Sequence, residues 1–330
     1  MLSALYDRLP LLCLALGIDA ACGEMGLLFR ALPHPVVLAG RAIEWCDHRL
    51  NRPADGAARR RAAGLLIVLG LVGLAGAAGW ALHRLCRGSV PGAAAEAFAA
   101  AVLLAQRSLF DHVADVGGAL SHDGIDAARV AVARIVGRDP ARLDAAAVAR
   151  AAIESLAENF SDGVVAPALW YLAAGLPGLL AYKMANTLDS MIGHNSERHR
   201  AFGWAAARFD DLLNLIPAPL SGLLIVAAAA FGPDTRPAAA LRIMRRDARN
   251  HRSPNAGWPE AAMAGALGLA LAGPRHYAAE TVDDPFLGDG TPDATAADIG
   301  RALRLYVRAC MLLAALSAGA WLTPHLTRPW

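Results

Sequence analysis

The sequence is poor in charge, in paired cysteines and above all in lysine. Charged residues make up 18% of the 330 positions against 56% that are hydrophobic, and Lys183 is the only lysine in the chain. The five cysteines are scattered through mostly apolar stretches without a CxxC pair. This pattern excludes a disulfide or zinc framework and indicates small buried hydrophobes. The formal net charge of +2 gives no reason to expect a nucleic-acid partner. A composition this apolar is typical of a membrane protein or of a very alanine-rich soluble one.

The scarcity of lysine makes Lys183 itself a candidate functional residue. Genome composition explains the bias from lysine to arginine, and chance explains one surviving lysine as well as function does. An ammonium and a guanidinium nevertheless do different chemistry, because one is a compact point charge and the other a planar fork. Both interpretations of Lys183 stay open on composition alone.

Two long runs are apolar enough to cross a membrane. Residues 64–82 contain no charged side chain, and nineteen helical residues cover close to the ~30 Å hydrocarbon core of a bilayer. Three arginines precede this run at positions 59–61, so the positive-inside tendency places that end in the cytoplasm. Residues 305–322 form the second run, in which Arg308 can snorkel to the bilayer surface.

Four further segments are weaker candidates, and polar stretches separate them. Asp19 and Glu24 interrupt the first, the second is short, and Pro and Gly break the other two. Such breaks are tolerated where the freed backbone faces protein or a water-filled cavity. The N-terminus lacks a basic n-region, so we expect a retained segment rather than a cleaved signal peptide. The weaker segments lie near residues 10–29, 93–105, 164–182 and 212–231, and the polar stretches cover 106–163, 183–210 and 232–304.

These patterns predict an all-α integral membrane protein built as a single helical domain over residues 1–330. We expect roughly four to six membrane-embedded helices, some of them broken or re-entrant. Residues 183–210 lie either outside the membrane or in a cavity open to the cytoplasmic side. We favour the cavity, because the polar clusters described next need a common chamber.

Acidic residues stand directly before the apolar segment at 164–182. Glu154, Glu158 and Asp162 are four residues apart, so a continuous helix would place all three on one face. Like charges at this spacing repel, and a cation between them would remove the penalty. Oxygen ligands without cysteine or histidine suit Mg²⁺ better than zinc. A solvated acidic helix face is the competing explanation, and for a lone ExxxE pattern it is the better one.

Similar clusters recur beside other apolar segments, where a solvated face is a weaker explanation. In "YKMANTLDSMIGHNSER" helical spacing places Lys183, Asn186 and Ser190 on one face, with Asp189 adjacent. The stretch "RFDDLLNLIPAP" contributes Arg208, Asp210, Asp211 and Asn214. Together these groups can hold Mg²⁺ and a polyphosphate. The sequence contains no GxxxxGK[ST], so a nucleotide is not held by a P-loop.

A fourth polar stretch covers residues 245–268. Its loop is stiffened by Pro254, and Pro259 is well placed to begin an alanine-rich helix. An Asx-rich turn and a hydrogen-bonded loop histidine explain much of it without any function. The candidate residues here are Asn250, His251, Ser253, Asn255, Trp258 and Glu260.

Long motifs in this order resemble the adenosylcobinamide-phosphate synthase family, an integral membrane enzyme family of cobalamin biosynthesis. The similarity extends from about residue 11 to 322 and includes "LPHPVVLAGRAIEW" and "IVGRD". One departure is Gly23-Glu24-Met25, where the family often has Gly-Asp-Pro, and the stretch "HNSERHRAFGW" also differs in its middle. The motifs with the closest resemblance are "RAAIESLAENFSDGVVAPALWY", "GLPGLLAYKMANTLDSMIGH", "FGWAAARFDDLLNLIPA" and "HRSPNAGWPEAAMAGALG".

The resemblance implies a reaction and a location. The expected reaction is ATP-dependent amide formation between adenosylcobyric acid and (R)-1-aminopropan-2-ol or its O-phosphate, giving adenosylcobinamide or its phosphate. The expected location is the bacterial cytoplasmic membrane, near other late-step cobalamin enzymes. ATP and Mg²⁺ are the implied cofactors.

Specific roles for the candidate residues remain hypotheses at this point. A carboxylate must be activated before it can acylate an amine, and cations must bring it to ATP because both are negative. The candidate metal ligands are Glu154, Glu158, Asp162, Asp189, Asp210 and Asp211. The candidate catalytic groups are Lys183, His251, Glu260 and Glu158. The candidate substrate and ATP contacts are Asn159, Asn186, Ser190, Arg208, Asn214, Asn250, Ser253, Asn255 and Trp258.

Two alternatives from other classes stay open. "NTLDS" and "DDLLN" are similar to the aspartate-rich Mg²⁺–diphosphate motifs of an intramembrane prenyltransferase. That class needs an almost entirely membrane-spanning bundle, whereas this chain has long polar stretches. A non-enzymatic corrinoid-binding membrane protein is the other alternative, and it leaves the recurring acidic clusters unexplained.

Overall fold

The computed structural model describes residues 2–137, 140–194, 196–276, 281–282 and 284–327. Most of this structure is helical, and its strands are four two-residue segments in two small antiparallel pairs. The predicted all-α membrane fold is confirmed. The chain divides into two compact units, one of residues 1–105, 166–214 and 317–330, the other of residues 106–165 and 215–316.

Three helical runs of the described chain are long and apolar enough to cross a membrane. They are Ala57–Cys86, Val90–Asp123 and Ala296–Thr323, and a fourth is counted if Trp204–Leu213 and Pro217–Ala229, bent by 47° at their break, form one span. The weak segment at 93–105 thus continues into the stretch that we expected to be polar. The break at "IPAP" separates these last two helices, because a proline can begin a helix but does not continue one.

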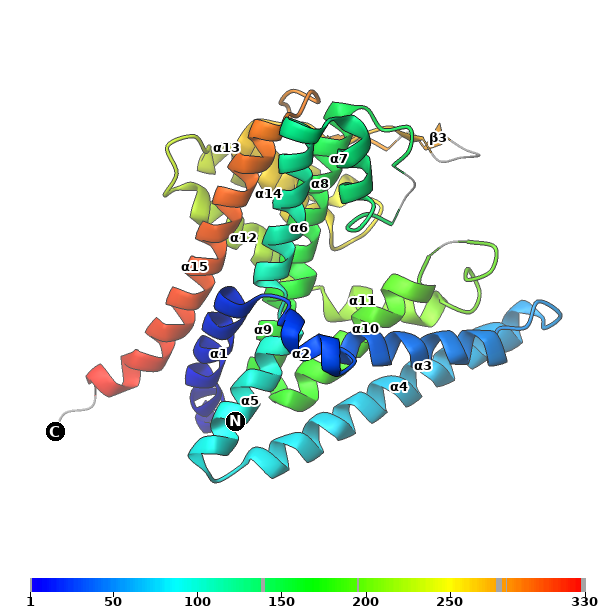
Figure 1. Cartoon of the computed structure of the whole chain (residues 1–330), viewed down its shortest axis with the longest axis vertical. Coiled ribbons are helices and arrows are strands. Elements are labelled where there is room, and N and C mark those ends of the chain that lie inside the picture. The colour runs from blue at the N-terminus through cyan, green and yellow to red at the C-terminus, as the bar shows by residue number, and fades with distance from the viewer. Residues whose placement is uncertain (1, 138–139, 195, 277–280, 283, 328–330) are drawn as a thin grey trace. The chain divides into compact units, whose positions relative to one another are not determined.

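The first unit is organised around the crossing of two helices, α4 (Ala57–Cys86) and α10 (Leu176–Ile192) (Figure 1). Gly79 allows the close approach of α4 to the start of α10, because a Cβ on Gly79 would lie 2.6 Å from the Leu176 carbonyl oxygen. Gly64 lets α4 approach the segment that follows α10, because a Cβ on Gly64 would lie 1.9 Å from the Phe202 carbonyl oxygen. The two helices therefore run antiparallel. The other helices of this unit are α1 (Leu2–Cys22), α2 (Gly26–Ala31), α3 (Pro35–Leu50), α5 (Val90–Leu103), α9 (Ala166–Ala174) and α11 (Trp204–Leu213).

A buried apolar cluster joins α3, α4, α10 and α11 at one end of the crossing. Ile43 of α3 and Ile67 of α4 pack with Leu188 and Ile192 of α10. The opposite face of α4 carries large exposed apolar side chains, among them Leu66, Leu74 and Leu85. An apolar surface of this extent on a helix of span length is suited to lipid.

The second unit is built around α14 (Gly257–Leu267), whose residues are buried apart from Trp258, which is half-buried. Its alanines and glycines allow α8 (Ala145–Phe160), α12 (Pro217–Ala229) and α13 (Pro237–Asp247) to pack closely around it. A Cβ on Gly265 would lie 2.7 Å from the Ala239 carbonyl oxygen, so α13 passes directly over α14. The remaining elements are α6 (Gln106–Gly118), η1 (Ala119–Asp123), α7 (Ile125–Val132), η2 (Ser161–Val165), η3 (Ala248–Asn250), β1 (Leu271–Ala272), β2 (Arg275–His276), β3 (Thr281–Val282), β4 (Phe286–Leu287) and α15 (Ala296–Thr327).

Candidate functional site

A hydrogen-bonded chain connects α10 and α11 around the carboxylate of Asp210, which is 6% exposed. Asn214 Nδ2 donates to Asp210 Oδ2 at 3.0 Å, and Asn186 Nδ2 donates to Asp210 Oδ1 at 3.4 Å. The Tyr182 hydroxyl in turn donates to Asn214 Oδ1 at 3.1 Å. Because both oxygens of a buried carboxylate accept hydrogen bonds, its orientation is fixed.

Two further carboxylates lie beside this chain. Burial raises the pKa of Asp189, and the negative charge of Asp211 raises it further, whereas His194 lowers it. Asp211 also lies 3.5 Å from Arg208 Nη1. A carboxylate whose pKa is raised by a neighbouring negative charge can be relieved by a cation between the two groups. The Asp189–Asp211 pair is therefore the strongest candidate for Mg²⁺ on these two helices.

Lys183 is half-buried and lies one helical turn before Asn186 on α10. Its charge reaches His34 at the start of α3, where it adds to burial in lowering the pKa of the imidazole. Ser190 is exposed and donates to the Asn186 carbonyl oxygen at 2.9 Å. The expected face of α10 is thus present, with the ammonium, the amide and the hydroxyl on successive turns.

Two glycines that we did not single out hold these helices in place. A Cβ on Gly203 would lie 1.6 Å from the Ile192 carbonyl oxygen, so the start of α11 lies against the end of α10. A Cβ on Gly193 would lie 1.9 Å from Asp189 Oδ1. Gly193 stands near the end of the motif that contains Lys183, and Gly203 stands near the start of the motif that contains Asp210. This position beside candidate residues was the signal that could have identified them.

A second polar network at this end was also missed from the sequence. Arg198 donates to Asp47 Oδ2 through Nη2 at 2.6 Å and through Nε at 2.9 Å. Asn51 Nδ2 donates to Asp47 Oδ1 at 2.7 Å, and Arg60 donates to Asn51 Oδ1 at 2.7 Å. His199 Nε2 lies 3.4 Å from Asp47 Oδ1. This network ties the loop after α10 to α3 and α4, and it supports the candidate site structurally.

In the second unit the three acidic residues at 154, 158 and 162 are in different environments. Glu154 is buried and accepts the Ala272 N–H at 2.8 Å, which holds Ala272 at the positive φ of 57°. Glu158 is exposed, whereas Asp162 is half-buried within the π-helical turn η2. A π turn breaks the four-residue register, so the shared face that a continuous helix would give is not formed. Asn159 donates to the Ser155 carbonyl oxygen at 2.9 Å.

The loop before α14 brings a histidine to a buried glutamate. His251 Nε2 lies 3.8 Å from Glu260 Oε2, and Glu260 is 2% exposed. His251 Nδ1 lies 3.1 Å from the Ser253 backbone nitrogen and 3.3 Å from the Ser253 carbonyl oxygen, which holds the ring with Nε2 toward the carboxylate. A pair of this kind can accept and return a proton.

The other candidates in this loop have structural contacts. Ser253 Oγ accepts the N–H groups of Asn255 and Ala256, each at 3.2 Å, and thereby caps the turn. Asn255 is buried, Asn250 is exposed and Trp258 packs against the cluster of Ile243 and Leu287. The first unit thus brings together the candidates of α10 and α11, and the second brings together those of the loop before α14.

Among the residues that the structure describes, no group of three or more His, Cys, Asp or Glu side chains is gathered as for a metal ion. Magnesium does not need one, because it is usually bound through one or two carboxylates together with substrate phosphates and water. The chemistry of Asp189 and Asp211 fits that mode of binding.

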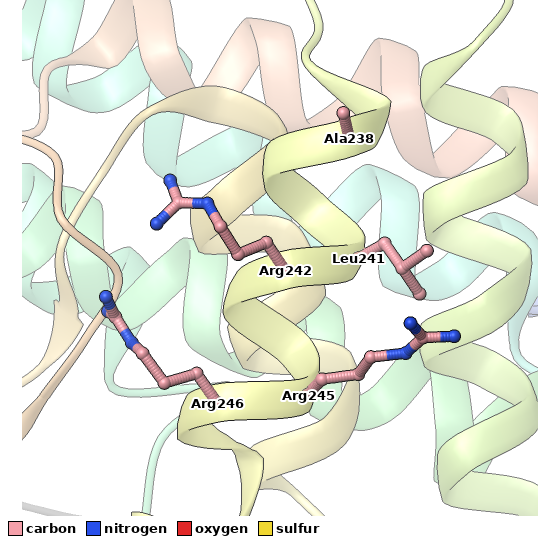
Figure 2. Close-up of a pocket in the computed structure, with 5 residues that line it drawn as sticks. All are labelled: Ala238, Leu241, Arg242, Arg245 and Arg246. Carbon is pink, nitrogen blue, oxygen red and sulfur yellow. The ribbon is translucent and has the colours of Figure 1, made fainter.

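A cavity of about 500 Å³ on α13 is lined by three arginines, Leu241 and Ala238 (Figure 2). Arg242 and Arg246 point to one side, where they bind Asp289 at 2.8 Å and 2.6 Å, and Arg245 points to the other. Asp289 therefore pairs with two of the three guanidinium groups, and Asp247 also binds Arg246. None of the predicted site residues lines this cavity.

The fold and the polar clusters define an all-α membrane protein that carries charged side chains at the ends of apolar helices. A sequence model of the family described as "CobD/Cbib protein" matches residues 12–306. The chain therefore belongs to the CobD/Cbib family, whose curated relatives are named for cobalamin biosynthesis, and the resemblance found in the sequence is confirmed.

Three of the most similar relatives each bear the name cobalamin biosynthesis protein CobD. The protein of Brucella melitensis is 51% identical over 316 residues, which cover 95% of this chain and 97% of the relative. That of Sinorhizobium fredii is 54% identical over 93% of this chain and 95% of its own length. That of Rhodobacter capsulatus is 47% identical, with coverage of 91% and 93%. No solved structure matches the chain.

Proposed function

We propose that this member of the CobD/Cbib family catalyses ATP-dependent amide formation in cobalamin biosynthesis. The acyl substrate is adenosylcobyric acid, and the amine is (R)-1-aminopropan-2-ol or its O-phosphate. The observation that carries the proposal is the cluster on α10 and α11. It combines the only lysine of the chain with three carboxylates and two amide side chains, at the ends of apolar helices.

The first step of this reaction must join two anions, the propionate carboxylate and the γ-phosphate of ATP. In this proposal Lys183 and Arg208 neutralise phosphate charge and Asn186 orients the phosphate oxygens. Asn214, which we expected to contact substrate, is wholly buried and bonded to Asp210 and Tyr182, so it positions Asp210 instead. Mg²⁺ would be held by Asp189 and Asp211, and when bound it would neutralise phosphate oxygens. Asp210 accepts from both asparagines and so acts as a positioning residue.

The second step transfers the activated acyl group to the amine, which must lose a proton to become an amide nitrogen. The His251–Glu260 pair of the second unit is a proton acceptor of the required kind, because a buried glutamate can stabilise an imidazolium. Exclusion of water protects the activated acyl group from hydrolysis.

We further propose that the reaction takes place at the bacterial cytoplasmic membrane, on its inner face, where ATP is available. The Lys183 cluster lies on the half of α10 that packs against Ile67 and Val68, near the arginine-rich start of α4. Arginine-rich helix ends favour the cytoplasmic side. Late-step cobalamin enzymes are the partners we expect there.

A reconstituted assay tests the proposed reaction. Protein purified in detergent is supplied with ATP, Mg²⁺, adenosylcobyric acid and aminopropanol or its phosphate, and the amide is detected by mass spectrometry. We expect product and ADP in equal amounts. Absence of product in an assay with an active positive control contradicts the proposal.

Substitution of Lys183 tests the site separately. Lys183→Arg keeps the charge but replaces the compact ammonium, so we expect kcat/KM to fall by about 10–100-fold. Arg245→Lys makes the reverse exchange at an exposed position of α13, so it is the matched control and should retain wild-type turnover. Wild-type turnover in Lys183→Arg would show that Lys183 has no specific role. Asp210→Asn, which keeps the shape of the side chain, then tests whether the charge inside the hydrogen-bonded chain is needed.

A further inference from the structure

Three segments of the first unit meet at the arginine-rich start of α4. The end of α3 and the start of α4 lie side by side there (Figure 1). Asn51, directly after α3, accepts a hydrogen bond from Arg60 of α4 at 2.7 Å and donates to the Arg198 carbonyl oxygen at 3.1 Å. Arg198 belongs to the loop between α10 and α11. The charged side chains of these three segments therefore gather at one end of the unit.

Positive charge dominates this end. Residues 47–61 and 197–204 contain seven arginines but only three carboxylates. Two of the carboxylates already bind arginines, at 2.6 Å and 3.0 Å, and the third, Glu197, is exposed. Four further arginines are exposed, and none of them pairs with a carboxylate in the part of the chain that the structure describes. We call these four the arginine patch: Arg49, Arg52, Arg61 and Arg200.

Two arginines of the patch lie over exposed tryptophan rings. Arg61 Cζ is 5.9 Å from the ring centroid of Trp204, and Arg49 Cζ is 5.8 Å from that of Trp45. Trp204 is 47% exposed and Trp45 is 61% exposed. Exposed tryptophan beside the end of a membrane helix is typical of the headgroup level of a bilayer, where the ring contacts apolar chains and its N–H reaches polar groups.

The length of α4 places the patch at the same level. At the other end of this helix Arg84 lies over Trp80, 5.7 Å from the ring centroid. From Arg61 to Trp80 the helix rises through nineteen residues, about 29 Å, which matches the ~30 Å hydrocarbon core of a bilayer. The face between them exposes large apolar side chains such as Leu66 and Leu74. Arg61 therefore lies where the lipid headgroups begin.

The other end of α4 has a more balanced charge. A cavity of about 360 Å³ lies there, and its lining includes Glu96, which is only 4% exposed. Glu96 accepts hydrogen bonds from His83 at 2.9 Å and from the Tyr171 hydroxyl at 3.1 Å. The charged residues of the lining are Asp7, Arg8, His83, Arg87 and Glu96. Carboxylates thus accompany the arginines at that end, and the start of α4 carries the larger excess of positive charge.

The surface around the patch is apolar as well as positive. An acidic protein surface would match the charge alone. A phospholipid also matches the apolar face, because Leu65, one helical turn after Arg61, is 46% exposed. The structure therefore favours a lipid over a protein as the occupant.

We propose that the arginine patch binds the headgroups of anionic phospholipids, of the phosphatidylglycerol type, whose acyl chains lie along the exposed face of α4. A guanidinium group donates to two oxygens of a phosphate diester at once. Zwitterionic headgroups carry a cation next to the phosphate, which the arginines of the patch repel. The proposal does not depend on the amide-forming activity, because no residue of the patch belongs to the candidate site.

Lipid binding to the purified full-length protein tests the proposal. Protein in detergent is mixed with equal amounts of phosphatidylglycerol and phosphatidylcholine that have the same acyl chains, and the retained lipids are counted by native mass spectrometry. We expect phosphatidylglycerol to be retained preferentially, by about tenfold or more. The preference should fall as ionic strength rises, because salt screens exposed charges. Equal retention of the two lipids overturns the proposal and leaves an acidic protein surface as the partner of the patch.

Substitutions show whether the preference comes from the patch. Arg61→Gln and Arg49→Gln should each reduce it by about fivefold, the contribution of one arginine near an anionic surface. Arg200→Gln should do the same, and it leaves both tryptophan contacts in place. Arg84→Gln is the matched control, because Arg84 is exposed on the same helix and also lies over a tryptophan, but at the end away from the patch. An equal reduction in Arg84→Gln, or no reduction in any patch variant, contradicts the proposal.

Discussion

At the scale of single residues, this protein uses buried carboxylates in three different ways. Asp210 is held between two asparagines, Glu154 holds a backbone N–H at a strained residue, and Glu96 faces a mixed-charge cavity. Each occurs in an apolar neighbourhood, where an unsatisfied charge is costly. Their hydrogen-bond partners distinguish the three roles, and the sequence does not show these partners.

Asp47 provides a prediction for pH dependence. Burial alone would raise its pKa, but hydrogen bonds from Asn51 and Arg198 and the charge of Arg198 lower the pKa below its ordinary value. A carboxyl whose pKa is lower in the folded state stabilises the fold above its unfolded pKa of about 3.9, and this contribution is lost as pH falls through the folded pKa. Thermal unfolding of Asp47→Asn in detergent should therefore show a lower Tm than wild type near neutral pH. The difference should narrow below about pH 4.

Asp111→Asn is the control for this measurement. Its carboxylate pairs with Arg107 on an exposed helix face, where ion pairs contribute little. We expect Tm to remain close to wild type across the same pH range. A constant difference in Tm between Asp47→Asn and wild type down to low pH would show that the stabilisation is not linked to ionisation of Asp47.

At the scale of elements, glycine decides how the helices cross. Residues 64–82 contain glycines that look alike in the sequence, yet Gly64 lies against the Phe202 backbone and Gly70 has no neighbouring atom within 4 Å of an added Cβ. Gly64→Ala should lower the unfolding free energy by about 1–3 kcal/mol, because the backbone must move apart. The measurement is denaturant unfolding in detergent.

Gly70→Ala is the matched substitution on the same helix. It should leave stability unchanged or raise it by about 0.5–1 kcal/mol, because alanine favours the helix. Equal stability of the two variants would contradict the close approach of α4 to the Phe202 backbone.

At the scale of the whole molecule, the direction of α4 through the membrane determines access to the candidate site. The arginines at 59–61 and the positive-inside tendency predict that the loop before α4 faces the cytoplasm and that the turn after it faces outward. Ala54→Cys and Ser89→Cys, each in a chain freed of its five native cysteines, test this with a thiol reagent that does not cross membranes. In intact cells we expect labelling of Ser89→Cys, and labelling of Ala54→Cys only after permeabilisation. The reverse pattern would place the Lys183 cluster away from ATP and contradict the proposed function.

Much of the molecule follows from local patterns in the sequence. The apolar runs at 64–82 and 305–322 lie within α4 and α15, because uncharged stretches of this length favour membrane helices whatever surrounds them. Asp210 and Asn214, four residues apart, likewise form a hydrogen bond, because side chains at this spacing on a helix are close whatever packs around the helix. The same spacing did not extend from Glu154 and Glu158 to Asp162, since a π turn replaced the α-helix at Ser161. The Asp47–Arg198 network was missed because its members are 151 positions apart.

The sequence by itself therefore determined that this is a helical membrane protein of the CobD/Cbib family and which polar stretches carry its candidate chemistry. These properties depend on composition, helical period and motif, which are local. Only the tertiary structure decided that Glu154 accepts a backbone N–H and that Asp210 accepts from an asparagine side chain. It also decided that Glu96 lines a separate cavity. Burial and hydrogen-bond partners set the behaviour of a charge, and both arise from segments that are distant in the chain.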